Sequence, residues 1–91
     1  MKATFIRQLE GWRSDARLYH LDPAISFETI DDMGKTDYVI VSAARMMGPE
    51  TYIFPARKDG TAINMLELSG SFRGSLDHAQ ALLNAGYKKA R

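Results

Sequence analysis

The segment Tyr38–Ala44 constrains the fold more than any other part of the chain. It reads Tyr-Val-Ile-Val-Ser-Ala-Ala, a dense apolar run rich in β-branched residues and of strand length. Such a run, without alternating polar positions, is typical of a strand that is buried on both faces. We therefore expect Tyr38–Ala44 to be a central strand of a sheet.

A second strand is predicted at Thr51–Phe54, after the turn residues Met47–Glu50 and before Pro55, which lacks a donor for the ladder. These two strands should form an antiparallel hairpin. The remaining β-rich stretches predict a first hairpin that ends at Asp22–Pro23, a short edge strand, and a bulged strand after the turn at Asp59–Gly60. Their ranges are Thr4–Trp12, Ala16–Leu21, Ile25–Ile30 and Thr61–Leu68.

The C-terminal part of the chain predicts one helix over residues 75–85. Ser75 is a suitable N-cap, and Asp77 in the first turn suits the positive end of the helix dipole. Gly86 is suited to the left-handed position after the helix, which would let Tyr87 pack back on Leu82. The spacing also predicts one apolar stripe, made of Leu76, Ala79, Leu82 and Leu83.

These elements predict a single α+β domain over residues 1–91. Its expected architecture is an antiparallel β-meander of four to five strands with one C-terminal helix packed on one face. Residues 88–91, Lys-Lys-Ala-Arg, are expected to be a frayed basic tail. One helix cannot cover a sheet of this size, so the other face must be solvated, curled closed or covered by a second copy. We expect a homodimer.

Composition excludes several classes of protein. The chain has no cysteine, which rules out disulfides and thiolate metal sites. Its 12 Lys plus Arg against 11 Asp plus Glu make nucleic-acid binding a poor expectation, because nucleic-acid binders usually carry a basic excess. No apolar run approaches the roughly 20 residues of a membrane span, and none resembles a signal peptide. We expect a protein of the cytosol.

No catalytic or metal-binding pattern is present. His20 and His78 are the only histidines, and their spacing does not predict a metal site. Ser75, Asp77 and His78 would point in different directions from one helical turn, and no nucleophile elbow occurs. We therefore expect a protein that is not an enzyme and that uses no cofactor and no metal.

The loop at residues 70–75 is the first candidate binding site. It contains Ser71, Arg73 and Gly74 and leads into the expected helix at Ser75. A helix start combined with an arginine can bind an anion such as a phosphate group. The alternative is that the glycines only make a turn and that Ser75 only caps the helix.

Three further residues are candidates for contact with a partner protein. Met46 and Met47 lie at the tip of the predicted hairpin, and methionine adapts to irregular partner surfaces. Tyr52 shares a strand face with Phe54 and could anchor a partner. For all of them, packing into the core is the alternative.

Several short motifs are spread over most of the chain. They are Ala16–Tyr19 near Asp22–Pro23, Pro49–Ala56, Glu67–Leu68, Gly70–Gly74, Asp77–His78 and Ala85–Tyr87. Together they resemble small proteins of phage and prophage genomes. The chain departs from that pattern near Asn64–Leu66, where it lacks a tryptophan. No established activity belongs to the group, so no functional residue carries over.

The resemblance implies a setting in the cytosol of a bacterial host. Small phage proteins often bind and block a host component, and anti-CRISPR proteins are one such class. By this analogy we expect an inhibitor that blocks an unidentified host protein by direct binding. The alternative is a small module that sequesters an anion or a nucleotide, a phosphate-bearing small molecule, at residues 70–75.

Overall fold

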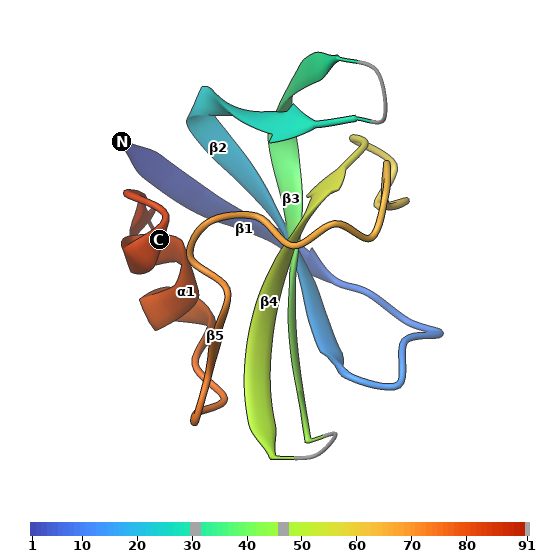
Figure 1. The fold of residues 1–91 in the computed structure, drawn as a ribbon, viewed down its shortest axis with the longest axis vertical. Coiled ribbons are helices and arrows are strands. Elements are labelled where there is room, and N and C mark those ends of the chain that lie inside the picture. Colours follow the sequence, from blue (N-terminus) through green and yellow to red (C-terminus); the bar gives the residue numbers. More distant parts are fainter. Residues whose placement is uncertain (30–31, 46–47, 91) are drawn as a thin grey trace.

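A computed structural model describes residues 1–29, 32–45 and 48–90 of the protein (Figure 1). A single strongly twisted sheet carries one short helix on one side. The elements, in chain order, are β1 (Lys2–Gln8), β2 (Asp15–Glu28), β3 (Met33–Arg45), β4 (Pro49–Ala56), β5 (Phe72–Arg73), α1 (His78–Asn84) and β6 (Lys88–Ala90). The α+β class is confirmed.

The sheet has six strands in the order β5-β4-β3-β2-β1-β6. β1 to β4 form the predicted antiparallel meander, and β5 adds to it in antiparallel orientation. β6 is parallel to β1, so the sheet is mixed and the prediction of four to five purely antiparallel strands is wrong. β5 and β6 are two and three residues long, which is too short to produce a recognisable periodicity.

Residues 88–90 do not form the predicted frayed tail. Lys88 donates its backbone N–H to the carbonyl of Met1 at 2.9 Å, and the segment pairs with Lys2–Thr4. Arg91 lies outside the described residues. The tail prediction failed because a chain end gains order when the edge of a sheet accepts it, and sequence alone does not show that edge.

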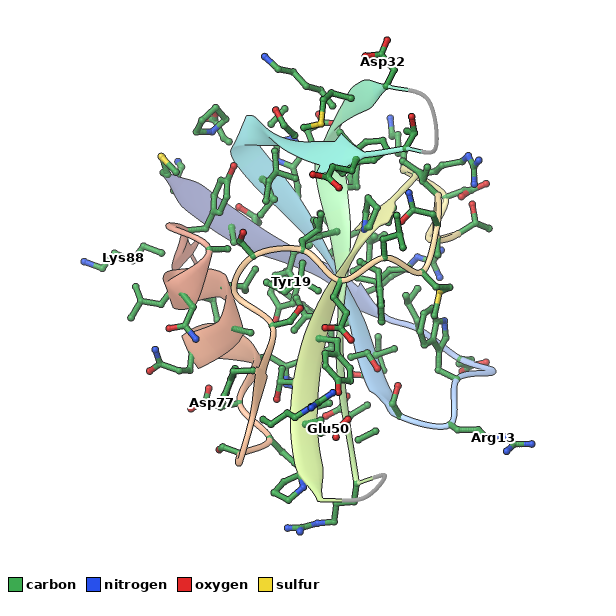
Figure 2. The ribbon with its side chains drawn as sticks, viewed as in Figure 1. Arg13, Tyr19, Asp32, Glu50, Asp77 and Lys88 are labelled. Atoms are coloured by element: carbon green, nitrogen blue, oxygen red, sulfur yellow. The ribbon has the colours of Figure 1, made fainter. Side chains whose placement is uncertain are left out.

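The central position of β3 is confirmed. Val39, Ile40 and Val41 have no exposed surface, and successive residues alternate between two cores. Val39 and Val41 pack with the helix and with Tyr19, which lies at the centre of Figure 2. Ile40 points to the opposite face of the sheet, as the pleat requires.

The chain itself buries the central part of the face opposite the helix. Its buried cluster comprises Leu9, Ala16, Leu18, Ile40 and Ala56, with Trp12, Tyr38 and Ala62 packed against it. The loops after β1 and β4 thus close over this face. The homodimer, which we expect to form through an uncovered face or edge of the sheet, stays a prediction.

β2 joins two segments that the sequence separates. Its pairing with β3 is interrupted between His20 and Ile25, where the Asp22–Pro23 dipeptide lies, but the strand resumes and continues to Glu28. The predicted edge strand that starts at Ile25 is thus the second half of β2 as far as Glu28. Because β1 pairs with β2 only as far as Asp22, the end of the β2–β3 hairpin extends beyond β1.

The strand predicted at Thr61–Leu68 is wrong. Only Ala62 forms a bridge, with Ala56, and the segment then runs irregularly beside β4. The Asn64 side chain accepts a hydrogen bond from the Leu66 N–H at 3.0 Å and donates to the Glu28 carbonyl at 3.3 Å. Such local side-chain bonds compete with a β-ladder for the backbone.

The helix begins later than predicted, and a different face of it is buried. Asp77, not Ser75, is the N-cap, because its carboxylate accepts the Gln80 N–H at 3.0 Å. His78, Ala81 and Leu82 are the buried residues, whereas Leu76, Ala79 and Leu83 are exposed. The predicted stripe is therefore wrong except at Leu82.

No helix among the described residues is long and apolar enough to cross a membrane.

The predicted C-terminal motif of the helix is confirmed. Gly86 has a φ of 95°. Its N–H donates to the Leu83 carbonyl at 2.9 Å, and the Tyr87 N–H donates to the Leu82 carbonyl at 2.8 Å. Tyr87 is buried in the same core cluster as Leu82. This pair of bonds satisfies helix carbonyls that would otherwise lack donors.

Candidate functional site

Arg73 lies on β5 opposite Glu50 of β4 and contacts residues of that strand. Its Nε donates to the Tyr52 hydroxyl at 3.3 Å and lies 3.5 Å from Glu50 Oε1. The Tyr52 hydroxyl in turn donates to the other oxygen of Glu50, and this hydrogen bond raises the pKa of Tyr52. The Arg73 side chain is 74% exposed, but it already has an anionic partner within the chain.

The other polar groups of the 70–75 loop attach it to β4. Ser71 Oγ accepts the Ile53 N–H at 2.9 Å, and the Gly74 N–H donates to the Pro49 carbonyl at 2.7 Å. The Ser75 carbonyl accepts the Thr51 hydroxyl at 2.8 Å. An anion bound here would have to compete with Glu50 for Arg73, and the capping carboxylate of Asp77 would repel it from the helix start. The anion site stays a prediction with little geometric support.

The structure brings Tyr52 next to Arg73, and it packs Phe54 into the core. The rings of Tyr52 and Phe54 are 6.2 Å apart, and Trp12 stacks on Phe54 at 6.3 Å. Phe54 is 7% exposed, so packing accounts for it. Met46 and Met47 lie outside the described residues.

A groove of about 820 Å³ lies between the end of the β2–β3 hairpin and the irregular segment at residues 65–69. Residues of the β2–β3 hairpin form one wall, and Figure 1 shows this end of the hairpin in teal at the top. Three large apolar side chains stand exposed along it, with exposed fractions of 60% for Met65, 58% for Met33 and 54% for Leu66. The lining residues are Ile25, Ser26, Phe27, Glu28, Met33, Met65, Leu66, Glu67, Leu68, Ser69 and Ala85.

Phe27 is a nearly buried apolar residue of the groove, and Gly34 holds its ring in place. The two residues pair across the hairpin, and the ring lies directly over the glycine. A Cβ at position 34 would lie 2.6 Å from Phe27 Cζ, so only glycine permits this contact. An aromatic ring over a cross-strand glycine shields the exposed backbone and fixes the ring's position.

The groove is lined mainly by apolar residues, and its charged groups are all carboxylates. Its charged residues are Glu28 and Glu67, both exposed, and none of its lining residues is a histidine, lysine or arginine. Sequence reasoning missed this site because Met65–Leu68 resembles a strand. The available signal was the adjacent pair Met65 and Leu66, which a half-buried strand would not place side by side.

The two histidines, His20 and His78, contact different residues and do not form a joint site. His20 is paired with Asp37 at 3.2 Å, whereas the ring of His78 is buried against β2 and donates Nε2–H to the Asp15 carbonyl at 2.8 Å. Burial lowers the pKa of His78, and the charges of Arg17 and Lys89 act in the same direction. The hydrogen bond and the carboxylate of Asp15 oppose that shift. Among the described residues, no three metal-ligating side chains converge.

The stability of the protein should fall when the pH drops below about 6.5. With its lowered pKa, folded His78 resists protonation, so the unfolded chain binds more protons in this range. The loss begins near the pH at which unfolded histidine titrates and is complete below the folded pKa. Urea unfolding from pH 8 to pH 5 measures it.

The control is His78→Gln, which retains a donor for the Asp15 carbonyl but does not titrate. It should flatten the pH dependence between pH 7 and pH 5, whereas His20→Gln should leave the contribution of His78 in place. An unchanged pH profile in His78→Gln would show that this histidine is not the group responsible. The Asp15 carboxylate acts at lower pH. Its burial opposes the shift, but hydrogen bonds from Gln8 and Arg17 hold its pKa below 3.8.

Comparisons of the chain with protein families, with curated proteins and with solved structures found no match.

Proposed function

We propose that this protein is a non-catalytic binding protein that occupies a surface of a partner protein through the groove between the β2–β3 hairpin and residues 65–69. The observation that carries the proposal is the exposure of Met33, Met65 and Leu66 along one groove. Grouped apolar side chains on a small domain cost solvation free energy, and such a patch is typical of an interaction site.

The exposed methionines of the groove favour a protein as the bound partner, because a single rigid small molecule would not need such adaptable side chains. Two of the three exposed side chains are methionines, which have flexible, polarisable side chains that adapt to irregular surfaces. The nearly buried Phe27 ring provides a fixed apolar contact beside them. This combination of one rigid aromatic and several adaptable side chains favours a partner segment with large apolar anchors.

The proposal extends to the biological role. The resemblance to phage and prophage proteins favours a host protein as the partner and inhibition by occupancy as the effect, as in an anti-defence protein. We place this action in the host cytosol. No substrate is converted and no cofactor is needed, since the proposed mechanism is steric.

The substitution Leu66→Glu tests the site, and Leu83→Glu is its matched control. Leu83 is exposed to 56%, almost the same as Leu66, but lies on the outer face of α1 and does not line the groove. We expect wild type and Leu83→Glu to capture the same protein from bacterial lysate. Leu66→Glu should reduce capture at least about tenfold, because a charge in a central apolar contact removes a hot spot.

Circular dichroism must first show that both variants are folded. The captured protein is identified by mass spectrometry and its affinity is measured with purified components. Equal capture by all three forms would remove the groove from the binding site. Failure of the wild type to capture any host protein would contradict the proposed function.

A further inference from the structure

The groove combines apolar side chains with two negatively charged residues. Glu28 extends from the end of β2 on one wall, and Glu67 lies on the opposite segment, next to Leu66. Both residues are exposed, and the lining contains no cationic side chain. Two glutamates and no cationic residue among the lining residues favour a negative potential in the groove, although the whole chain carries a net charge of +1.

The nearest cations by sequence and pairing do not neutralise this arrangement. Lys35 pairs with Ser26 across the hairpin but does not line the groove. Arg73 attracts Glu67 electrostatically, but its guanidinium contacts Tyr52 and Glu50. Among the described residues Glu67 forms no salt bridge, so its carboxylate can pair with a cation that enters the groove.

We infer that the occupant of the groove is a peptide segment of a partner protein in which large apolar residues stand beside a lysine or an arginine. This inference rests on the proposed function and adds the chemistry of the partner. The apolar residues contact Phe27, Met33, Met65 and Leu66, and the basic residue pairs with Glu28 or Glu67. An acidic segment is rejected because its charge would meet two like charges at close range.

Selection of peptides from a random 12-residue library displayed on phage tests the inference. The full-length protein is the target, and Leu66→Glu is used to remove peptides that bind elsewhere. Peptides that bind the wild type should be enriched in large apolar residues with lysine or arginine nearby, and depleted of aspartate and glutamate. Their affinity should decrease as salt is added, since exposed charges are screened.

Charge reversal provides the decisive variant. In the double variant Glu28→Lys/Glu67→Lys, the selected peptides should carry acidic residues in place of basic ones. A purely structural role for the two glutamates would not invert the charge preference. Neutralising each carboxylate, in Glu28→Gln and Glu67→Gln, should weaken a selected basic peptide about two- to fivefold. Glu10→Gln, an exposed site remote from the groove lining, should have no effect.

The outcomes separate this inference from the proposed function. Groove-dependent peptides without any preference for basic residues, or no inversion in the double variant, would overturn the inference and leave the binding site in place. Capture of a host protein that is lost in Leu66→Glu but is unaffected by Glu28→Gln and Glu67→Gln would do the same. A library that produces no Leu66-dependent peptide would count against both.

Discussion

Gly70→Ala should lower the free energy of unfolding by about 2–5 kcal/mol, the largest effect that we expect from one added methyl group. Gly70 has a φ of 107°, and a Cβ there would lie 2.5 Å from the carbonyl oxygen of Ala81. It would also lie 2.9 Å from Ala85 Cβ and from Ile53 Cδ1. Overpacking contributes about 1–3 kcal/mol and the left-handed backbone about 1–2 kcal/mol.

Gly74 is the matched control for this substitution. Its φ of 108° is almost the same, but nothing lies within 4 Å of an added Cβ. Gly74→Ala should therefore lower the free energy of unfolding only by the cost of the left-handed backbone, about 1–2 kcal/mol. Urea unfolding of both variants measures the difference. If the two substitutions cost the same, the close packing of residue 70 against the helix is wrong.

Leu82→Ala should destabilise the protein by about 2–5 kcal/mol, whereas Leu83→Ala should change stability within about ±0.5 kcal/mol. Leu82 has no exposed surface and packs in the core with Ile53 and Tyr87, so truncation leaves a cavity under the helix. Leu83 is 56% exposed. Comparing the two variants is informative because the sequence pattern predicts that both leucines are buried in one stripe, whereas the structure buries only Leu82.

Thermal or urea unfolding of the two alanine variants measures this contrast directly. Similar losses for both would favour the stripe predicted from sequence over the observed orientation of α1. Leu82→Ala could instead cause only a small loss of stability and leave the slope of the unfolding free energy against urea concentration unchanged. That result would indicate that the helix is not docked on the sheet.

Much of the candidate site lay beyond sequence reasoning. The sequence identified Arg73 and Tyr52 separately. The contacts of Arg73 with Tyr52 and Glu50 depend on the pairing of β4 with β5. The groove was missed entirely. Its described walls come from residues 25–28 with Met33 and from residues 65–69, which lie far apart in the sequence, and the hairpin on the first wall extends beyond β1.

The helix illustrates where pattern reasoning fails. Three leucines and an alanine near residues 76–83 satisfy a helical stripe, but Leu76 precedes the N-cap, and the docked side of the helix carries His78, Ala81 and Leu82. The N-cap at Asp77 fixes where the helix starts, and the hydrogen bond from His78 to the Asp15 carbonyl attaches one side of the helix to β2. Ser75 and Asp77 are both suitable N-cap residues, and local preference alone does not choose between them. The partner of His78 lies 63 residues away in the sequence.

The sequence by itself determined the features that depend on local chemistry. An uninterrupted β-branched run can be satisfied only by burial on both faces, which made β3 central, and the adjacent turn residues produced the meander of β1 to β4. Gly86 determined how the helix ends, because glycine adopts the left-handed conformation there at little cost in free energy.

Only the tertiary structure decided the edges of the sheet and the groove. β6 exists because Lys88–Ala90 finds the edge of β1, and β5 because the 70–75 loop reaches β4. Contacts between residues distant in the chain carry no local signature. The sixth strand therefore could not be anticipated, and the adjacent pair Met65 and Leu66 could not show by itself which segment would face it across the groove.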